Sequence, residues 1–575
     1  MRINDVEKVT GLTQKAIRLY ESKGLISISR DSNGYRNYTP EDVETLKSIK
    51  LFRSVGISLT DIRLYLFGVI TVEELIYKRK AEILKESGTN SEKYRICESI
   101  LNKTDIDSFS LTDILTESDD IKGDAYGELT VGIDIGTTTV SASVYDLDNK
   151  SQLEAYSIPH NSYTTIGELS EQSVAVIMEK STKFLDHILN TYDKIISIGI
   201  TGQMHGIVYV DEMGNWVSDL INWQDKRGDI VLENGETACQ RIKNITGVDI
   251  STGYGIATHY YNTLKGAVPK NAVGFVSIMD LFAMKICGIK KPIIHTSVAA
   301  SFGLFDVKRG CFMTDKLSML SIDNSFLPCV TGESLVIGKC RDIPVSVPLG
   351  DNQASFLGSV RENSDTILVN IGTGSQISAV GDYIEPTKDI ELRPFIEEKY
   401  LICGSALCGG FAYSMLESFF RAYTVSAGLQ DASQYKIMNQ LGSEAYEKGE
   451  EGLLVDTSFS GKRSDPTLRG SIINIDRSNF TPSSLVLGVL KGMCNELYEL
   501  YASVPERKKR IVASGGAVKK NALLKRLLSD RFSMPVYLNS AKEEASTGAA
   551  LFAAFATGKI KYGSGFSEHI SYTEE

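Results

Sequence analysis

Two glycine–threonine turns are the segments of this 575-residue chain best suited to bind phosphate groups. They are Asp134-Ile-Gly-Thr-Thr-Thr139 and Asn370-Ile-Gly-Thr-Gly-Ser375, and each follows an apolar run typical of a buried strand. Small polar residues leave backbone N–H groups uncovered, and these groups form with the threonine hydroxyls a concave donor cluster for phosphate oxygens. Taken alone, either turn is as well explained by an ordinary hairpin loop as by a phosphate-binding turn. Together they predict a nucleotide held between two lobes.

An acidic residue precedes the second turn within the glycine-flanked segment Pro348-Leu-Gly-Asp-Asn-Gln-Ala354. The Asp351 carboxylate can accept the proton of a substrate hydroxyl while that oxygen attacks a γ-phosphorus. The alternative is that Asp351 caps a helix. Near the C-terminus, a Gly-Gly turn in Arg510-Ile-Val-Ala-Ser-Gly-Gly-Ala517 would let a flat base approach the backbone closely.

Two further polar segments have the composition of a sugar site. They are Thr201-Gly-Gln-Met-His-Gly206 and Ile221-Asn-Trp-Gln-Asp-Lys-Arg227. Bidentate polar groups beside a flat apolar face suit a hydroxyl-rich ligand, and the segments supply them through Gln203, His205, Gln224, Asp225, Arg227 and Trp223. No P-loop, nucleophile elbow or zinc-binding helix motif is found.

Length and composition place these motifs in a multidomain soluble protein. A chain of 575 residues predicts three or four domains. We expect no membrane association and no signal peptide, because no apolar stretch approaches the ~18 residues of a membrane span and the N-terminus leads directly into an amphipathic pattern. The nine cysteines contain no CxxC pair, which favours reduced thiols and a cytoplasmic location.

The first 66 residues differ in charge from the rest. They hold 11 Lys/Arg and 8 Asp/Glu, a net charge of +3, which leaves −14 for the remainder of a chain whose total is −11. Gly11 ends a first short helix, Thr13 caps a second, and Asn33-Gly34 is typical of a type I′ hairpin turn. Thr39-Pro40 begins a third helix. This order predicts a winged helix-turn-helix.

This N-terminal segment resembles the MerR family of transcriptional regulators. The matching residues are Ala16-Ile-Arg-Leu-Tyr-Glu-Ser-Lys-Gly-Leu25, Gly34-Tyr-Arg-Asn-Tyr38 and Val55-Gly-Ile-Ser-Leu-Thr-Asp-Ile62. The resemblance implies that residues 1–70 bind double-stranded DNA, with Thr13, Lys15 and Arg18 facing bases and with Arg36 and Tyr38 reaching the backbone. Residues 71–127 are expected to form a helical connector and an acidic linker. The connector has no sustained heptad, so a homodimer is left open.

From about residue 128 strands alternate with helical patterns, which favours an α/β architecture. The polar segments described above resemble the FGGY carbohydrate kinases of the actin-like ATPase superfamily. Within that family, five blocks are most similar to the sedoheptulokinase group: Thr201-Gly-Gln-Met-His-Gly-Ile-Val208, Asn222-Trp-Gln-Asp-Lys-Arg227, Thr252-Gly-Tyr-Gly-Ile-Ala-Thr258, Asp280-Leu-Phe-Ala-Met-Lys-Ile-Cys-Gly288 and Leu349-Gly-Asp-Asn-Gln-Ala-Ser355. The resemblance implies two ribonuclease-H-like lobes, with sugar and phosphate in residues 128–360 and ATP in residues 361–560.

The resemblance also implies a role for individual residues. Asp351 would be the general base, and Asp134 would help to hold hydrated Mg²⁺. The phosphates of ATP would lie against Thr137, Thr138, Gly372 and Thr373, and the adenosine against Gly515, Gly516 and Asn521. The sugar pocket would be lined or supported by Gln203, Met204, His205, Trp223, Asp280, Asn352 and Gln353. One departure from the family pattern is Ser141, which occupies the position of a common Lys or Arg after the first turn.

The sequence therefore predicts an ATP-dependent ketose kinase, acting on sedoheptulose to give sedoheptulose 7-phosphate, with a DNA-binding domain at its N-terminus. The alternatives are a xylulokinase-type enzyme and a sugar-sensing regulator with little turnover, which Ser141 favours. An actin-like ATPase without a sugar substrate is disfavoured by the Gln-Met-His and Trp-Gln-Asp clusters.

Overall fold

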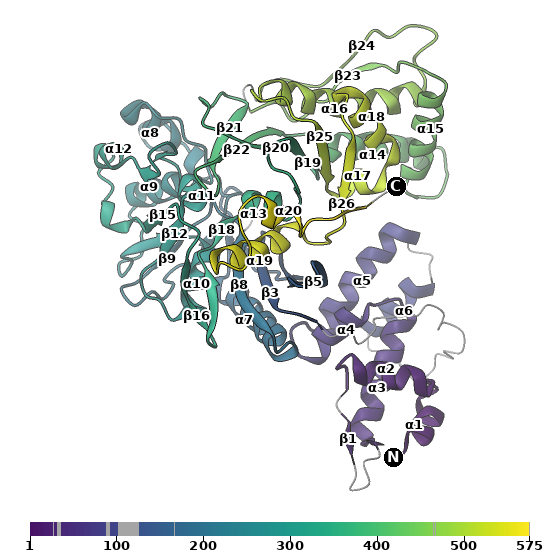
Figure 1. The fold of residues 1–575 in the computed structure, drawn as a ribbon. Coiled ribbons are helices and arrows are strands. Elements are labelled where there is room, and N and C mark those ends of the chain that lie inside the picture. The colour runs from purple at the N-terminus through teal and green to yellow at the C-terminus, as the bar shows by residue number, and fades with distance from the viewer. Residues whose placement is uncertain are drawn as a thin grey trace. The chain divides into compact units, whose positions relative to one another are not determined.

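The computed structural model describes residues 1–26, 28–30, 36–87, 92–101, 126–165, 167–463, 465 and 467–573. It confirms an α/β protein with two sheet-containing lobes and a small helical module at the N-terminus (Figure 1). The chain divides into two compact units. Unit 1 comprises residues 1–127 and 179–194, and unit 2 comprises residues 128–178 and 195–575. None of the helices within the described ranges is long and apolar enough to span a membrane.

Unit 1 begins with the expected order of short helices and a hairpin. Its elements are α1 (Ile3–Thr10), α2 (Gln14–Ser22), β1 (Ser29–Arg30), β2 (Arg36–Asn37), α3 (Pro40–Ser54), α4 (Leu59–Leu66), α5 (Val72–Ser87) and α6 (Glu92–Leu101). The predicted caps are confirmed: α1 ends at Gly11 with φ 63°, and Thr13 Oγ1 accepts from the Ala16 N–H at 3.2 Å. A reciprocal capping box joins Thr39 and Asp42 at the start of α3. The strands β1 and β2 pair antiparallel, and the predicted Asn33-Gly34 turn lies outside the described residues.

Residues 179–194, the C-terminal part of helix α7 (Val174–Thr191) with the segment after it, also belong to unit 1. Within the unit, Lys180 forms an ion pair with Glu74 of α5, and the His187 ring lies 4.7 Å from the Phe67 ring. Burial lowers the pKa of His187 to about 4, so its imidazole is neutral at neutral pH. Helix α7 is one continuous element, and its first residues, Val174–Met178, belong to unit 2.

The first lobe of unit 2 is built on a seven-stranded sheet with the order β16-β17-β8-β3-β4-β5, in which β18 also pairs with β8. The strands are β3 (Leu129–Ile135), β4 (Thr139–Asp146), β5 (Ser151–Pro159), β8 (Ile195–Gly202), β16 (Val336–Cys340), β17 (Ile343–Ser346) and β18 (Leu349–Gly350). Strands β3 and β4 form an antiparallel pair, whereas β3 and β8 run parallel. The first phosphate turn lies between β3 and β4, and Gln203 follows the end of β8, so the sheet brings the two segments together.

Smaller elements extend this lobe between β5 and helix α13 (Asp351–Leu357). They are β6 (Tyr163–Thr165), β7 (Glu171–Gln172), β9 (Val208–Val210), β10 (Leu220–Ile221), η2 (Arg227–Asp229), α8 (Ala238–Thr246), α9 (Gly255–Lys265), β11 (Gly274–Val276), α10 (Ile278–Cys287), β12 (Ile293–His295), α11 (Thr296–Ala299), η3 (Ala300–Phe302), β13 (Phe305–Asp306), β14 (Cys311–Phe312), α12 (Thr314–Met319), η4 (Asn324–Phe326) and β15 (Cys329–Thr331).

The second lobe has its own seven-stranded sheet in the order β21-β22-β20-β19-β25-β26-β27. The strands are β19 (Thr366–Ile371), β20 (Ser375–Gly381), β21 (Ile390–Pro394), β22 (Tyr400–Ala406), β25 (Arg510–Ser514), β26 (Val536–Asn539) and β27 (Tyr572–Thr573), and a separate hairpin is formed by β23 (Leu454–Asp456) and β24 (Ser471–Ile473). The helices are α14 (Gly410–Ser426), α15 (Tyr435–Glu447), α16 (Pro482–Ala502), α17 (Gly516–Lys520), α18 (Ala522–Phe532), α19 (Glu544–Ala556) and α20 (Ser564–Ser567).

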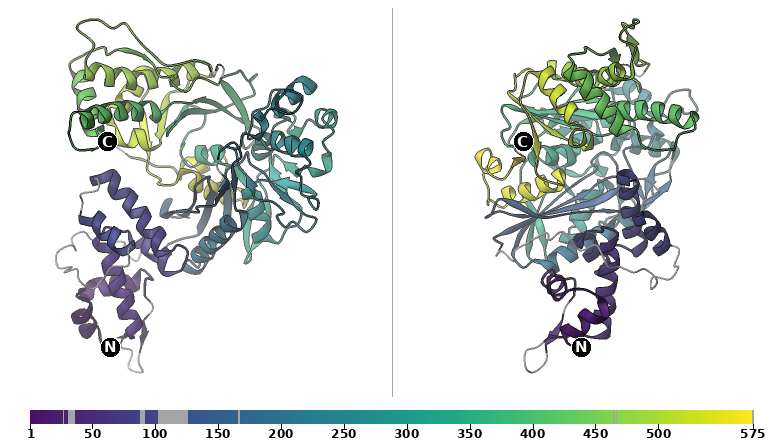
Figure 2. Two further views of the ribbon diagram at one scale, coloured as in Figure 1. Left: turned by 180° about the vertical axis from the view of Figure 1, so that it is seen from behind. Right: turned by 90° about the vertical axis from the view of Figure 1, so that its right-hand side faces the viewer.

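Helix α19 joins the two lobes, because it packs against the sheet of the first lobe although it belongs to the C-terminal part of the chain. Figures 1 and 2 show this yellow helix against the dark blue strands. The approach to α13 is so close that a Cβ on Gly548 of α19 would lie 1.8 Å from the Ala354 carbonyl oxygen. Only glycine permits this contact, and it fixes α19 against the helix that begins at Asp351.

Candidate functional site

The first phosphate turn, residues 136–138, is held by hydrogen bonds from several segments of the first lobe. Gln172 Nε2 donates to the Thr137 carbonyl at 2.8 Å, and Trp223 Nε1 donates to Thr137 Oγ1 at 2.9 Å. Gln203 Nε2 donates both to the Gly136 carbonyl at 3.3 Å and to Gln172 Oε1 at 3.1 Å. The predicted sugar residues Gln203 and Trp223 therefore contact the predicted phosphate turn, while Thr138 is exposed.

The second phosphate turn is held by the N-terminus of α14. The Gly410 N–H donates to the Gly372 carbonyl at 2.8 Å, and the Phe411 N–H donates to the Thr373 carbonyl at 3.0 Å. Gly372 and Thr373 are exposed, so the turn is open to a ligand. Gly409 and Gly410 were not singled out in the sequence, although this Gly-Gly pair follows β22 closely and begins a helix, as the pair at Gly515 follows β25.

Asp351 is the first residue of α13 and lies between the two turns in the sequence. Its Oδ1 accepts from the Asn352 backbone N–H at 2.6 Å and from Asn352 Nδ2 at 2.8 Å. The N-cap position belongs to Gly350, which disfavours the cap interpretation of Asp351. Burial raises the pKa of Asp351, and the opposing effects come from Arg393 and the two hydrogen bonds of Asn352.

A second carboxyl group, that of Asp134 at the end of β3, lies close to Asp351. Burial raises the pKa of Asp134 to about 7, and the negative charges of Asp351 and Glu543 add to this effect. Within the described ranges no group of three or more acidic, His or Cys side chains forms a direct metal-ligand set. Mg²⁺ commonly keeps several waters and uses only one or two carboxylates with substrate phosphates, so Asp134 and its neighbours fit a hydrated Mg²⁺ ion.

The remaining predicted sugar residues near Asp351 lie at the start of α13 or border it. A Cβ on Gly350 would lie 2.5 Å from Gln353 Oε1 and 2.8 Å from Met204 Sδ, so Met204 and Gln353 border the segment that leads into Asp351. Asn352 Oδ1 accepts from Gln376 Nε2 of β20 at 2.9 Å. These contacts connect the start of α13 to both lobes.

His205 is partly exposed, and its ring lies 4.9 Å from the Tyr254 ring. Burial lowers the pKa of His205 to about 3, and the positive charges of Arg393 and Arg463 lower it further. The imidazole is therefore neutral at physiological pH and offers one donor and one acceptor, as a sugar hydroxyl requires.

Three predicted ligand groups have partners within the protein. Asp280 Oδ2 accepts from Ser277 Oγ at 2.6 Å at the start of α10. Arg227 Nε pairs with Asp225 at 2.7 Å, and its other nitrogens bind protein side chains, so this pair stabilises the lobe rather than offering its donors to a ligand. Asn521 Oδ1 caps α18 by accepting from the Leu524 N–H at 3.1 Å.

The two glycines predicted to frame the adenosine differ in their surroundings. Gly515 has φ 91°, and a Cβ there would lie 2.5 Å from the Ile371 carbonyl oxygen, so the turn itself requires glycine. Nothing lies within 4 Å of a Cβ on Gly516, which leaves open space above its backbone. The contact of Gly516 with a flat base stays a prediction.

In the N-terminal module the predicted base-facing residues lie on or beside α2. Thr13, Lys15 and Arg18 are all exposed. Arg36 pairs with Glu21 at 2.5 Å, which still leaves the guanidinium partly accessible. Tyr38 is only 1% exposed, and its ring lies in the core of the module. This placement favours a packing role for Tyr38 over the predicted contact with the DNA backbone.

Known protein families match both the N-terminal module and the two lobes of the chain. Residues 129–358 match the N-terminal domain, and residues 371–557 the C-terminal domain, of the FGGY family of carbohydrate kinases. Residues 1–67 match the MerR helix-turn-helix family of regulatory proteins. The two kinase matches cover well over half of the chain, so the chain belongs to the FGGY carbohydrate kinases and carries a MerR-type domain at its N-terminus.

Individual relatives are distant. Sedoheptulokinase of Mus musculus is 24% identical over 469 residues, covering 74% of this chain and 96% of the relative. Xylulose kinase of Staphylococcus xylosus is 26% identical over 453 residues, covering 74% and 90%. The crystal structure of xylulose kinase from Rhodospirillum rubrum superposes with a TM-score of 0.68 at 19% identity, over 78% of this chain and 93% of that one. This last likeness concerns the fold alone.

Proposed function

We propose that this kinase transfers the γ-phosphoryl group of ATP to a ketose, with sedoheptulose as the preferred acceptor and sedoheptulose 7-phosphate as the product. The observation that carries the proposal is the position of Asp351. Asp351 follows Gly350, which borders Met204 on the sugar side, and precedes Asn352, which binds Gln376 beside the second phosphate turn. A carboxylate between an acceptor pocket and a phosphate site is the arrangement that phosphoryl transfer to a hydroxyl needs.

The proposed reaction uses Asp351 as the general base. The acceptor oxygen forms a bond to the γ-phosphorus as its proton passes to Asp351, and the bond to the β,γ-bridging oxygen breaks to release ADP. Backbone N–H groups of the two turns would hold the phosphates, and neutral His205 would orient a sugar hydroxyl. Mg²⁺, held through water by Asp134, would neutralise charge on the phosphates when bound.

Sedoheptulose is the proposed acceptor because the sugar-side blocks of the sequence are most similar to sedoheptulokinases, and a sedoheptulokinase aligns over nearly its whole length. An ADP-release assay over sedoheptulose, xylulose, ribulose and glycerol tests the choice. We expect the highest kcat/KM with sedoheptulose, since pockets reject poor fits chiefly through polar groups left unpaired. A higher value with xylulose would replace the proposed substrate with that of the xylulokinase alternative.

Asp351→Asn tests the role of the base. We expect turnover to fall by about 10²–10⁴-fold while ATP binding changes little, the range usual for loss of a general base. Asp382→Asn is the matched control, because Asp382 is a surface acid paired with Lys399. Wild-type turnover in purified Asp351→Asn would contradict the assignment.

The sugar-sensing alternative rests on Ser141. Its side chain is 3% exposed and its hydroxyl donates to Ser157 Oγ at 2.9 Å, so this position supplies no positive charge to the first turn. A regulator with little turnover would bind ketose without releasing ADP. Calorimetric sugar binding together with a negligible kcat on every acceptor would favour this alternative.

A further inference from the structure

A buried arginine of the second lobe, Arg393, has one nitrogen without a partner near Asp351. Arg393 lies on the edge strand β21 and is 9% exposed. Its Nε and Nη2 both donate to Glu391 Oε2, at 3.1 and 2.6 Å. The buried Nη1 has no hydrogen-bond partner within the described residues. Leaving a charged donor unpaired in the interior is costly, which points to a ligand that accepts a hydrogen bond from Nη1.

The surroundings of Arg393 place it beside the start of α13. The carbonyl of the next residue, Pro394, accepts from Gln353 Nε2 at 2.8 Å, and two strands away Gln376 donates to Asn352 at 2.9 Å. Asp351 directly precedes these two α13 residues. The positive charge of Arg393 also acts on both neighbouring site residues, since it lowers the pKa of Asp351 and that of His205.

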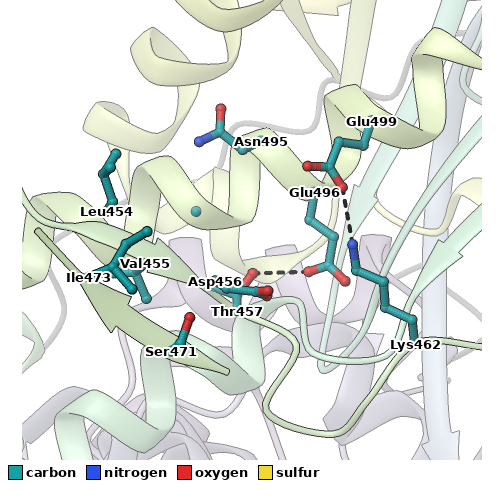
Figure 3. A pocket seen from close by; sticks show the side chains of 11 residues that line it. Leu454, Val455, Asp456, Thr457, Lys462, Ser471, Ile473, Asn495, Glu496 and Glu499 are labelled. Carbon is teal, nitrogen blue, oxygen red and sulfur yellow. Dashed lines mark hydrogen bonds and ion pairs between the residues drawn. The ribbon is translucent and has the colours of Figure 1, made fainter. Parts of the chain in front are cut away.

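The orientation of the Arg393 guanidinium is fixed by Glu391 of the same strand. Glu391 and Arg393 are two residues apart on one strand and share a face of the sheet. The other oxygen of Glu391 binds Arg463. The loop that carries Arg463 is anchored in turn, because Lys462 pairs with Glu499 of α16 at 3.1 Å at the rim of a cavity of about 350 Å³ (Figure 3). Two of the three guanidinium nitrogens are thus occupied by Glu391, and only Nη1 is left for a ligand.

Building on the proposed kinase reaction, we propose that Arg393 is a catalytic residue whose Nη1 donates to the oxygen atoms that gain negative charge beside Asp351 during phosphoryl transfer. It supplies from the second lobe the positive charge that Ser141 does not supply from the first. A guanidinium suits this task, because it stays charged and donates in a fixed plane. Donors aimed at developing charge in a water-poor site contribute most of their stabilisation in the transition state.

Substitution of Arg393 tests the proposal on the acceptor that the wild-type enzyme phosphorylates fastest. We expect Arg393→Met to lower kcat by about 10²–10³-fold, the usual cost of removing one such donor. The KM for ATP should stay within about threefold, because the interaction forms chiefly in the transition state. Arg393→Lys should retain an intermediate kcat. Lys399→Met is the matched control, since Lys399 is a partly exposed cation just before β22 that pairs with Asp382, and it should behave as wild type.

Chemical rescue separates a catalytic role from a structural one. Guanidinium at a non-denaturing concentration should raise the kcat of Arg393→Ala and leave that of Asp351→Asn unchanged. The proposal is overturned if Arg393→Met keeps wild-type kcat, or if Met, Lys and Ala variants lose activity only in step with a lowered Tm and show no rescue. Normal turnover in Asp351→Asn would instead reject the proposed base. If sedoheptulose is a poor acceptor, only the proposed substrate is rejected. The test of Arg393 still stands, because the kcat of its variants is measured with the acceptor that the wild-type enzyme phosphorylates fastest.

Discussion

Substitution of Gly410 offers a direct test of the second phosphate turn. A Cβ at this position would lie 2.5 Å from the Gly372 carbonyl oxygen, whereas ordinary van der Waals contact begins near 3.4 Å. The turn must therefore move by about 0.9 Å, the difference between these distances, and the 2.8 Å hydrogen bond from the Gly410 N–H weakens with it. Because Gly410 has no positive φ, alanine brings no backbone strain of its own.

A displacement of this size predicts a large kinetic effect and a small effect on stability. Misplacing a binding group by 1 Å can cost about 10²-fold in rate, so we expect kcat/KM for ATP to fall by roughly that factor in Gly410→Ala. Losing one hydrogen bond costs about 1 kcal/mol, which should lower Tm by only a few degrees. Gly565→Ala is the control, because the nearest atom to its Cβ lies 3.5 Å away. Wild-type kcat/KM for ATP in a folded Gly410→Ala protein would refute the assignment of this turn to phosphate binding.

Two other outcomes are expected. Gly548→Ala should destabilise unit 2 by at least about 1–3 kcal/mol, because its Cβ would meet the Ala354 carbonyl oxygen at 1.8 Å and neither backbone can yield easily; a Tm equal to that of Gly565→Ala would contradict the packing argument. Fluorescence anisotropy on DNA from upstream of the protein's own gene should show duplex binding that weakens with salt, with Lys15→Ala and Arg18→Ala reducing sequence preference and Arg36→Ala weakening all duplexes. No binding at low salt would contradict the DNA binding that the MerR resemblance implies, and repeating the titration with ketose and ATP tests whether DNA binding is coupled to the kinase site.

Local sequence patterns predicted the fold well wherever one segment determines its own structure. The Gly11 and Thr39 caps follow from local hydrogen bonding, and both phosphate turns follow apolar strands as expected. The same local patterns could not show that Tyr38 packs inside the module, because burial depends on which helices cover the hairpin.

The sequence could not predict which residues are brought together by the tertiary fold. Arg393 is near Asp351 because β21 forms the edge of its sheet and α13 lies beside it, and Glu543 is near Asp134 because α19 returns to the first lobe. No spacing along the chain signals either approach. Asn521 has a role that the family resemblance did not indicate, since its side chain caps its own helix.

Two carboxyl groups, the partly exposed Asp134 and the buried Asp280, have a pKa raised to about 7 for different reasons, and the causes are more informative than the value. For Asp134 the charges of Asp351 and Glu543 add to burial, as in a site built for a cation. For Asp280 burial acts alone, and its bond with Ser277 opposes it. The folded protein keeps the Asp280 proton that the unfolded chain loses near its ordinary pKa of 3.8, so stability from this group falls as pH rises from about 4 to about 7. Between pH 5 and pH 8 the Tm of Asp280→Asn should therefore fall by less than the Tm of the wild type. If both proteins show the same pH dependence of Tm, burial does not raise the pKa of the Asp280 carboxyl.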